Sequence, residues 1–129
     1  HGSTGNISVR LADGWLMTPT GTSFGHLDPA RLSRLGPDGE LLSGDAPTKE
    51  AALHRAMYDA RPGSGAVVHL HSTHSVAISV LEDVNPDDVL PPLTAYYVMR
   101  IGRLPLVPFF PPGDAQLAEL APRNLVVLY

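Results

Sequence analysis

Apolar and polar residues alternate near the start of the chain, and this alternation predicts an antiparallel pair of strands. Residues 7–11 alternate, Asp13-Gly14 is a dipeptide typical of a hairpin turn, and residues 15–18 resume the extended pattern. Asp28 followed by Pro29 predicts a short helical turn with the aspartate as its cap. Residues 37–40 combine proline, aspartate and glycine and predict another turn.

A helical pattern follows over residues 47–61, and Pro62-Gly63 predicts its end. Asp45 and Thr48 are both candidate caps for its start. The apolar residues that share one face of this helix are Leu53, Ala56, Met57 and Ala60.

The second half of the chain predicts further strands and helices. Residues 66–71 predict a buried strand, because β-branched and other apolar residues follow a glycine-rich turn. Residues 74–81 predict a helix packed on that strand. Two more strands are expected at residues 104–110 and 124–129, with a helix fragment over residues 116–120 between them.

Composition restricts the class of protein. The 129 residues are 43% hydrophobic and 17% charged, which indicates one globular domain rather than a disordered chain. The 13 prolines and 12 glycines argue against a helical bundle. A net charge of -4 without a Lys/Arg run gives no footprint for nucleic acid or an anionic membrane, so small-molecule or protein partners remain. Neither a membrane-spanning run nor a signal-peptide pattern is present, so we expect a soluble cytoplasmic protein.

The chain contains no cysteine, so any metal must be held by histidine and carboxylate side chains. His69 and His71 stand two residues apart in a predicted strand, so both imidazoles project from one face while Val68 and Leu70 face the core. Neutral imidazoles suit Zn²⁺ or a similar divalent ion. The alternative is a pair of histidines that make ordinary hydrogen bonds near a strand end.

Several polar residues near the predicted helix start have anion-binding character. A helix N-terminus attracts anions, so Thr48 and Lys49 could hold a phosphate there while Glu50 points toward the metal. Solvated capping residues are the competing interpretation. His54, one turn after Glu50, is interpreted as a structural or surface histidine.

Two loops, residues 2–6 and 18–22, combine glycine with hydroxyl side chains. Their backbone N–H groups could approach a phosphate closely. Each loop taken singly is equally typical of an ordinary turn.

Four motifs, in their order and spacing, resemble the class II aldolase and adducin family. They are Gly2-Ser3-Thr4-Gly5-Asn6-Ile7-Ser8, Thr18-Pro19-Thr20-Gly21, Pro47-Thr48-Lys49-Glu50 and His69-Leu70-His71-Ser72. Lys49 before Glu50, with residues 53–58 and 96–106, is similar to the branch of 3-oxo-tetronate 4-phosphate decarboxylases. Sugar-phosphate aldolases more typically have serine where Lys49 stands. The resemblance covers residues 1–129 and implies an α/β fold with a central, mostly antiparallel sheet flanked by helices in three layers.

The resemblance also implies roles for individual residues. His69 and His71 would bind zinc or another divalent metal, and Glu50 would be the acid/base residue and also touch the metal. Tyr96, or its neighbour Tyr97, would donate a proton. The positions that match those around the substrate phosphate are Asn6, Thr20, Gly21, Thr48 and Lys49. The family further implies a homotetramer that acts on a small phosphorylated sugar acid.

We therefore expect a carbon–carbon lyase that converts a 3-oxo-tetronate 4-phosphate to dihydroxyacetone phosphate and CO2 through a metal-stabilised enediolate. A class II sugar-phosphate aldolase is the alternative, because it passes through the same enediolate. A Schiff-base aldolase would need Lys49 as a desolvated nucleophile. An adducin-like scaffold without catalysis is a further alternative.

The family pattern has a third zinc histidine after the strand that resembles residues 124–129, and a helix before the glycine-rich opening. Neither is contained in these 129 residues. We therefore expect a single domain that is incomplete at both ends.

Overall fold

The computed structural model describes residues 5–120, and the structural statements below concern those residues. The strands and α-helices, in chain order, are β1 (Gly5–Leu11), β2 (Gly14–Met17), β3 (Ser33–Leu35), β4 (Leu41–Ser43), α1 (Ala51–Ala60), β5 (Ala66–Leu70), α2 (Thr73–Ser79), α3 (Ala95–Arg100) and α4 (Ala115–Leu120). Two 3-10 turns, η1 (Phe24–His26) and η2 (Pro29–Arg31), lie between β2 and β3. The predicted strand at residues 124–129 lies outside the described residues.

The strands form one antiparallel sheet in the order β4-β3-β2-β1-β5. The predicted hairpin is confirmed, since β1 and β2 pair up to Leu11 and Gly14. The predicted helical turn is also confirmed, because Asp28 accepts a hydrogen bond from the backbone N–H of Ala30. The turn at residues 37–40 joins β3 to β4, two short strands that the hydrophobic pattern does not predict.

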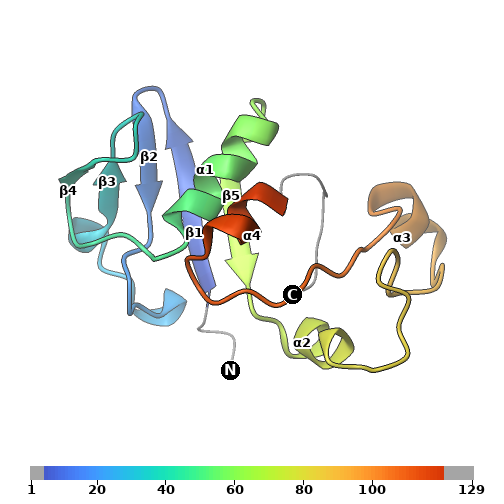
Figure 1. Ribbon diagram of the computed structural model, residues 1–129. Coiled ribbons are helices and arrows are strands. Elements are labelled where there is room, and N and C mark those ends of the chain that lie inside the picture. The colour runs from blue at the N-terminus through green and yellow to red at the C-terminus, as the bar shows by residue number, and fades with distance from the viewer. Residues whose placement is uncertain (1–4, 121–129) are drawn as a thin grey trace.

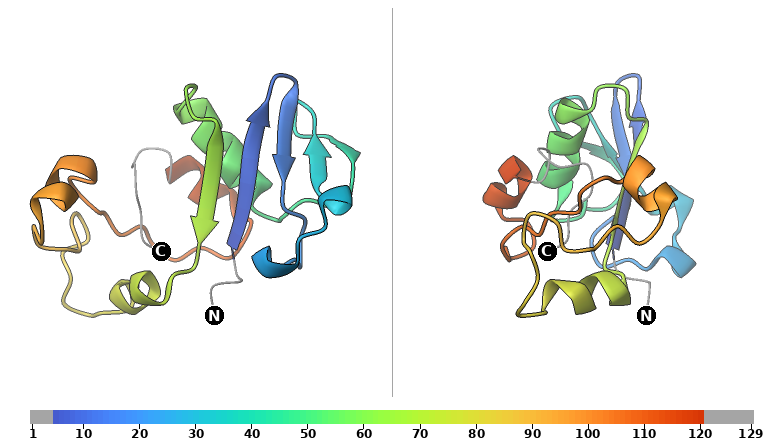
Figure 2. Two further views of the ribbon diagram at one scale, coloured as in Figure 1. Left: turned by 180° about the vertical axis from the view of Figure 1, so that it is seen from behind. Right: turned by 90° about the vertical axis from the view of Figure 1, so that its right-hand side faces the viewer.

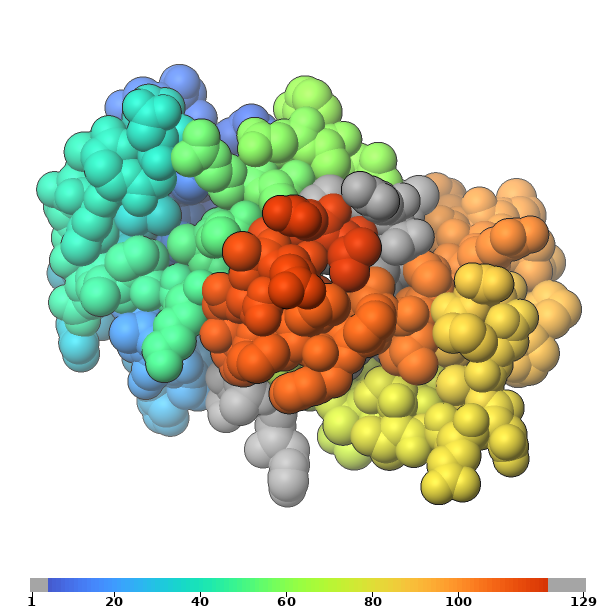
Figure 3. Space-filling view, in the orientation of Figure 1, coloured from blue at the N-terminus to red at the C-terminus, as the bar shows by residue number. Residues whose placement is uncertain are grey.

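Helices α1 and α4 lie on the same side of the sheet (Figures 1 and 2). Under α1, the core is a cluster of Trp15, Met17, Leu35 and Tyr58. A second cluster, Leu53, Val107 and Leu117, joins α1 to α4 and the segment before it. This segment and α4, orange to red in Figure 3, lie across the front of the molecule. The expectation of an antiparallel sheet flanked by helices is therefore confirmed.

The remaining helices lie beyond the β5 edge of the sheet (Figure 1). Helix α2 occupies most of the predicted range 74–81, but it packs through Ile78 against a separate cluster built on Val89 and Leu104. Residues 104–110 form no strand, although Leu104 O accepts a hydrogen bond from the Val89 backbone N–H and the Leu106 N–H donates to Pro86 O. Prolines at positions 105 and 108 have no backbone N–H to donate to a neighbouring strand, which accounts for the error.

Two expectations about burial are wrong. Val68 and Leu70 are 58% and 55% exposed instead of facing the core. They point away from α1, because β5 directs His69 toward that helix and alternate residues of a strand project to opposite faces. The apolar stripe of α1 is also incomplete, since the buried residues of this helix are Leu53, His54 and Tyr58.

Helix α1 begins at Ala51, four residues later than predicted. Glu50 is its N-cap residue, and Thr48 accepts a weak hydrogen bond from the Glu50 backbone N–H at 3.4 Å. Pro47 instead pairs with Pro19 in an isolated bridge, which holds the chain before the helix in an extended form. None of the helices between residues 5 and 120 combines the length and apolar character that crossing a membrane requires.

Candidate metal centre

Glu50, His69 and His71 converge at one end of the sheet. One potential ligand atom from each residue lies within 4.8 Å of the other two. Glu50 is the N-cap residue just before helix α1, His69 lies near the end of β5, and His71 follows the strand by one residue. The predicted meeting of these three side chains is therefore observed, although Glu50 and His71 lie just outside the regular elements expected to carry them.

The three side chains suit a divalent metal ion. Two imidazoles and a carboxylate are the ligand types that Zn²⁺ accepts in proteins that lack cysteine at the site. Glu50 is buried, His69 is half-buried and His71 is exposed, so the cluster extends from the protein interior at Glu50 to the surface at His71. The rings of His69 and His71 have centroids 4.7 Å apart, which keeps both imidazoles on the same side of the cluster.

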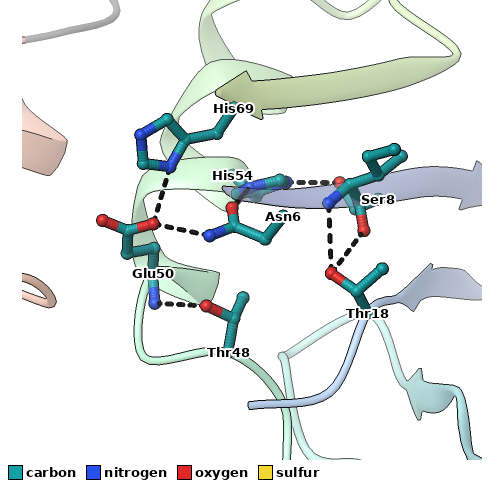
Figure 4. A network of polar contacts seen from close by, with 8 residues as sticks. Asn6, Ser8, Thr18, Thr48, Glu50, His54 and His69 are labelled. Carbon is teal, nitrogen blue, oxygen red and sulfur yellow. Dashed lines mark hydrogen bonds and ion pairs between the residues drawn. The ribbon is translucent and has the colours of Figure 1, made fainter. Parts of the chain in front are cut away.

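The Glu50 carboxylate is held by two hydrogen bonds to the same oxygen. His69 Nδ1 lies 2.6 Å from Glu50 Oε2, and Asn6 Nδ2 donates to that oxygen at 2.6 Å (Figure 4). Asn6 and His69 are Cα partners across β1 and β5, so the sheet presents both donors side by side. In Figure 4 the other carboxylate oxygen points away from these partners.

Burial alone would raise the pKa of Glu50, since it disfavours the charged form. The hydrogen bonds from His69 and Asn6, and the nearby imidazoles of His69 and His71, act in the opposite direction. Their combined effect leaves the pKa of Glu50 below its usual value. The carboxylate is therefore ionised at neutral pH, as a metal ligand or a general base must be.

Behind Glu50, a chain of buried polar side chains runs along the interface between α1 and β1. His54 Nε2 lies 2.5 Å from Asn6 Oδ1, and His54 Nδ1 lies 2.6 Å from Ser8 Oγ. Ser8 Oγ in turn lies 2.9 Å from the Tyr58 hydroxyl. Each of these side chains is at least 94% buried.

His54, interpreted from the sequence as a structural or surface histidine, lies in the middle of this chain of hydrogen bonds. It is 1% exposed, which excludes a surface position, and burial together with the nearby His69 lowers its pKa to about 4 although Glu50 raises it. Its spacing of four residues from Glu50 was the available signal, because residues i and i+4 lie on the same helical face. A polar residue four positions after a candidate acid/base residue is therefore expected to lie on the same side of the helix as that residue.

The residues predicted to surround a phosphate lie around the same end of the sheet. The backbone N–H of Thr20 donates to Ala46 O at 3.0 Å, which brings the loop containing Gly21 alongside the segment before Thr48. Lys49 is exposed and Thr48 half-buried. Asn6 differs from the others, because both ends of its side-chain amide are already bonded to Glu50 and His54.

The candidate proton donor does not join this group within residues 5–120. Tyr96 lies on α3 and is 77% exposed, and α3 lies beyond the β5 edge (Figure 1). Its neighbour Tyr97 bonds to Asp88 at 3.5 Å and packs against the cluster of Val89 and Leu104. The choice between the two tyrosines therefore stays a prediction.

Comparison with known proteins agrees with the family resemblance of the four sequence motifs. The model of the Class II Aldolase and Adducin N-terminal domain matches residues 1–127. The chain is 54% identical over 117 residues to the 3-oxo-tetronate 4-phosphate decarboxylase of Cupriavidus necator, which covers 91% of this chain and 54% of that protein. It is 33% identical over 121 residues to the L-fuculose phosphate aldolase of Escherichia coli K12. That alignment covers 92% of this chain and 54% of the aldolase.

Among solved structures, the Escherichia coli protein YgbL superimposes with a TM-score of 0.88 at 45% sequence identity. That match covers 99% of this chain and 64% of YgbL. The chain thus spans a little over half the length of the curated relatives named above. The shared part contains the sheet, α1 and all three side chains of the candidate metal centre.

Proposed function

This chain belongs to the Class II Aldolase and Adducin N-terminal domain family, and from this premise we propose that it carries the metal and acid/base residues of a 3-oxo-tetronate 4-phosphate decarboxylase. The observation that supports this most is the convergence of Glu50, His69 and His71 within 4.8 Å. Identity to the decarboxylase of Cupriavidus necator is 54%, against 33% to the fuculose phosphate aldolase, which favours decarboxylation over aldol cleavage.

We infer that His69, His71 and Glu50 hold Zn²⁺, although another divalent ion with similar ligand preference would fit the same donors. When bound, such an ion supplies a Lewis acid next to the substrate carbonyl. The Asn6 amide and the pairing of β1 with β5 hold the Glu50 and His69 side chains next to each other, where both would serve as ligands.

In the proposed reaction, the bond between C1 and C2 of the β-keto acid breaks, CO2 leaves, and the electron pair moves to the C3 carbonyl oxygen. A proton must then be added to C2. Glu50 is ionised at neutral pH, so it first takes the proton of the C2 hydroxyl and then delivers a proton to C2. As the C2–H bond forms, the electron pair returns from the C3 oxygen and the C3 carbonyl re-forms. Water protonates the C2 oxygen and leaves as hydroxide, and dihydroxyacetone phosphate is the product. Tyr96 is the other candidate donor for C2.

For the substrate phosphate we propose Thr20, Gly21, Thr48 and Lys49, which lie on two adjoining segments at the same end of the sheet. Lys49 provides the positive charge, and its exposure suits a phosphate better than the desolvation that a Schiff-base lysine needs. Asn6, already bonded on both sides, would contribute to the phosphate pocket only by its backbone. We further propose that the partner is a small phosphorylated sugar acid and that the protein is a cytoplasmic homotetramer.

The deciding experiment supplies 3-oxo-tetronate 4-phosphate to the purified full-length protein loaded with Zn²⁺. We expect release of CO2 and dihydroxyacetone phosphate, lost in Glu50→Gln. Absence of CO2, with condensation of dihydroxyacetone phosphate and an aldehyde, would establish the aldolase alternative. A protein that binds no metal and shows neither activity would be a scaffold.

A further inference from the structure

The Asn6 amide is held in one orientation by its neighbours. A carboxylate only accepts hydrogen bonds, so the end of the amide that faces Glu50 Oε2 must be Nδ2. Oδ1 then points the other way and requires a donor. His54 Nε2 lies 2.5 Å from it, and among the described side chains this imidazole is the hydrogen-bond partner of Oδ1.

This requirement determines the protonation of His54. If Nε2 carries the proton that is donated to Asn6, the neutral ring accepts at Nδ1. Ser8 must therefore donate its hydroxyl proton to His54 Nδ1, and Tyr58 must donate to Ser8. All the donors run in a single direction, from Tyr58 through Ser8, His54 and Asn6 to Glu50.

We propose that His54, supported by Ser8 and Tyr58, is a positioning residue that keeps the Asn6 amide turned so that its Nδ2 faces Glu50. The proposal rests on the role of Glu50 in the proposed function. Without a donor at Oδ1, the amide loses its preference between two nearly isosteric orientations. The flipped orientation would place Oδ1 against Glu50 Oε2, and two acceptors in contact would push the carboxylate from its place.

The series of hydrogen bonds from Tyr58 to Glu50 is unsuited to moving protons to Glu50. A primary amide does not readily give up a proton on one side and take one on the other, so Asn6 interrupts any relay from His54. Holding the carboxylate is therefore the function that the geometry favours. It would affect both metal binding and the acid/base step, because outer residues that orient a ligand typically change affinity or activity by about 10–100-fold when removed.

Ser8→Ala is the main test variant, because it removes one hydroxyl without altering His54 itself. Ser33→Ala is its matched control: both serines are buried on strands, and Ser33 donates to the backbone of Asp45 and takes no part in the hydrogen bonds that lead to Glu50. In the full-length zinc-loaded protein we expect Ser8→Ala to lower kcat by about 10-fold with little change in KM. Ser33→Ala should leave kcat unchanged.

His54→Leu and His54→Gln provide the second comparison. Leucine removes both hydrogen-bonding atoms, whereas the glutamine amide offers one donor and one acceptor, as the neutral imidazole does. We expect His54→Leu to weaken Zn²⁺ binding by about 10–100-fold and His54→Gln to restore most of that affinity. Equal affinities for the two variants would overturn the proposal.

One readout is independent of any activity. Nitrogen-15 NMR of the wild-type imidazole rings should show the His54 proton on Nε2 and none on Nδ1. A proton on Nδ1, or a Ser8→Ala variant that matches Ser33→Ala in kcat and Zn²⁺ affinity, overturns the positioning role. If the wild-type protein releases no CO2, the proposed function fails, and the NMR and Zn²⁺ measurements still decide the role of His54.

Discussion

Individual side chains at the candidate metal centre differ in how firmly the protein holds them. Glu50 is 6% exposed and bonded at Oε2, and His69 lies against that oxygen. His71 is exposed beyond the end of β5. Glu50 and His69 are therefore held in place before any metal binds, while His71 is the candidate ligand whose removal would disturb the surrounding structure least.

Substitution of His71 separates metal binding from folding. We expect His71→Ala to lower Zn²⁺ affinity by more than the roughly 10–100-fold typical of an outer partner, because it removes a ligand atom, with little loss of stability. His74→Ala is the control, since His74 is also an exposed histidine but lies on α2 outside the cluster. Isothermal titration with Zn²⁺ measures both. Equal affinities for the two variants would contradict a role for His71 as a ligand.

The low pKa of His54 predicts how stability depends on pH. Its value of about 4 in the folded protein lies below the ordinary 6.5. Between these values the unfolded chain binds a proton at His54 that the folded protein does not, so stability is complete above about pH 6.5 and declines as the pH falls toward 4. The loss is up to about 3 kcal/mol. The pKa of Glu50 is also lowered, so its contribution to stability is lost at a lower pH than that of His54.

Urea unfolding of the metal-free protein at several pH values measures this dependence. His54→Gln should flatten the decline between pH 6.5 and 4, because glutamine does not titrate. His26→Gln replaces an exposed histidine and should leave the decline unchanged. The same pH dependence in His54→Gln and in the wild type would show that other groups are responsible.

At the scale of elements, α1 and β1 meet because their side-chain spacings match. Four residues rise about 6 Å along a helix and two residues about 6.7 Å along a strand. Glu50, His54 and Tyr58 can therefore face Asn6 and Ser8 in successive steps. The i, i+4 and i, i+2 spacings are visible in the sequence, and so both faces were predictable in principle. The register between α1 and β1 was not predictable, since it depends on the packing of Trp15 and Tyr58 in the core.

Gly5 is the position where strand pairing and the metal centre are most directly linked. Its φ of +132° is rarely adopted by other residues, and an added Cβ would overlap the backbone oxygen of His69. We expect Gly5→Ala to destabilise the protein by at least about 1–3 kcal/mol and to weaken Zn²⁺ binding by displacing His69.

Gly63→Ala is the control for this substitution. Gly63 lies in the turn before β5, has no positive φ, and an added Cβ there meets no atom within 4 Å. Its effect on unfolding should stay within about 0.5 kcal/mol. Chemical denaturation and zinc titration of both variants provide the comparison, and similar losses in both would refute the link between Gly5 and His69.

At the scale of the whole molecule, the described residues leave one sheet face open. Ile7, Val9, Val68 and Leu70 point away from α1, and the last three are 44%, 58% and 55% exposed. Apolar residues on both faces are typical of a sheet covered on both sides. Helices α1 and α4 lie on the other face, so within residues 5–120 the predicted third layer is not represented (Figure 2). That part of the fold stays a prediction.

The sequence allowed the hairpin, α1, β5 and the convergence of Glu50, His69 and His71 to be predicted, because each depends on local spacing or on a motif. Burial of Val68 and the strand at residues 104–110 were predicted wrongly for a common reason. Local hydrophobicity shows that a segment is apolar, but only the tertiary arrangement decides which face is covered and whether an extended segment finds a partner strand. The chain of hydrogen bonds behind Glu50 could not be predicted for the same reason, since it joins residues that are 44 to 50 positions apart in the sequence.

Metal binding should stabilise the whole molecule, because its ligands come from segments brought together only by folding. Zn²⁺ at about 100 times its Kd contributes about 2.7 kcal/mol, which for a domain of this family corresponds to a rise in Tm of about 5–10 °C. Differential scanning calorimetry of the full-length protein with Zn²⁺ and after chelation measures this shift. Mg²⁺, which prefers oxygen ligands, should produce little change. His71→Ala should lose most of the Zn²⁺ effect, whereas an undiminished rise in that variant would place the stabilising ion elsewhere.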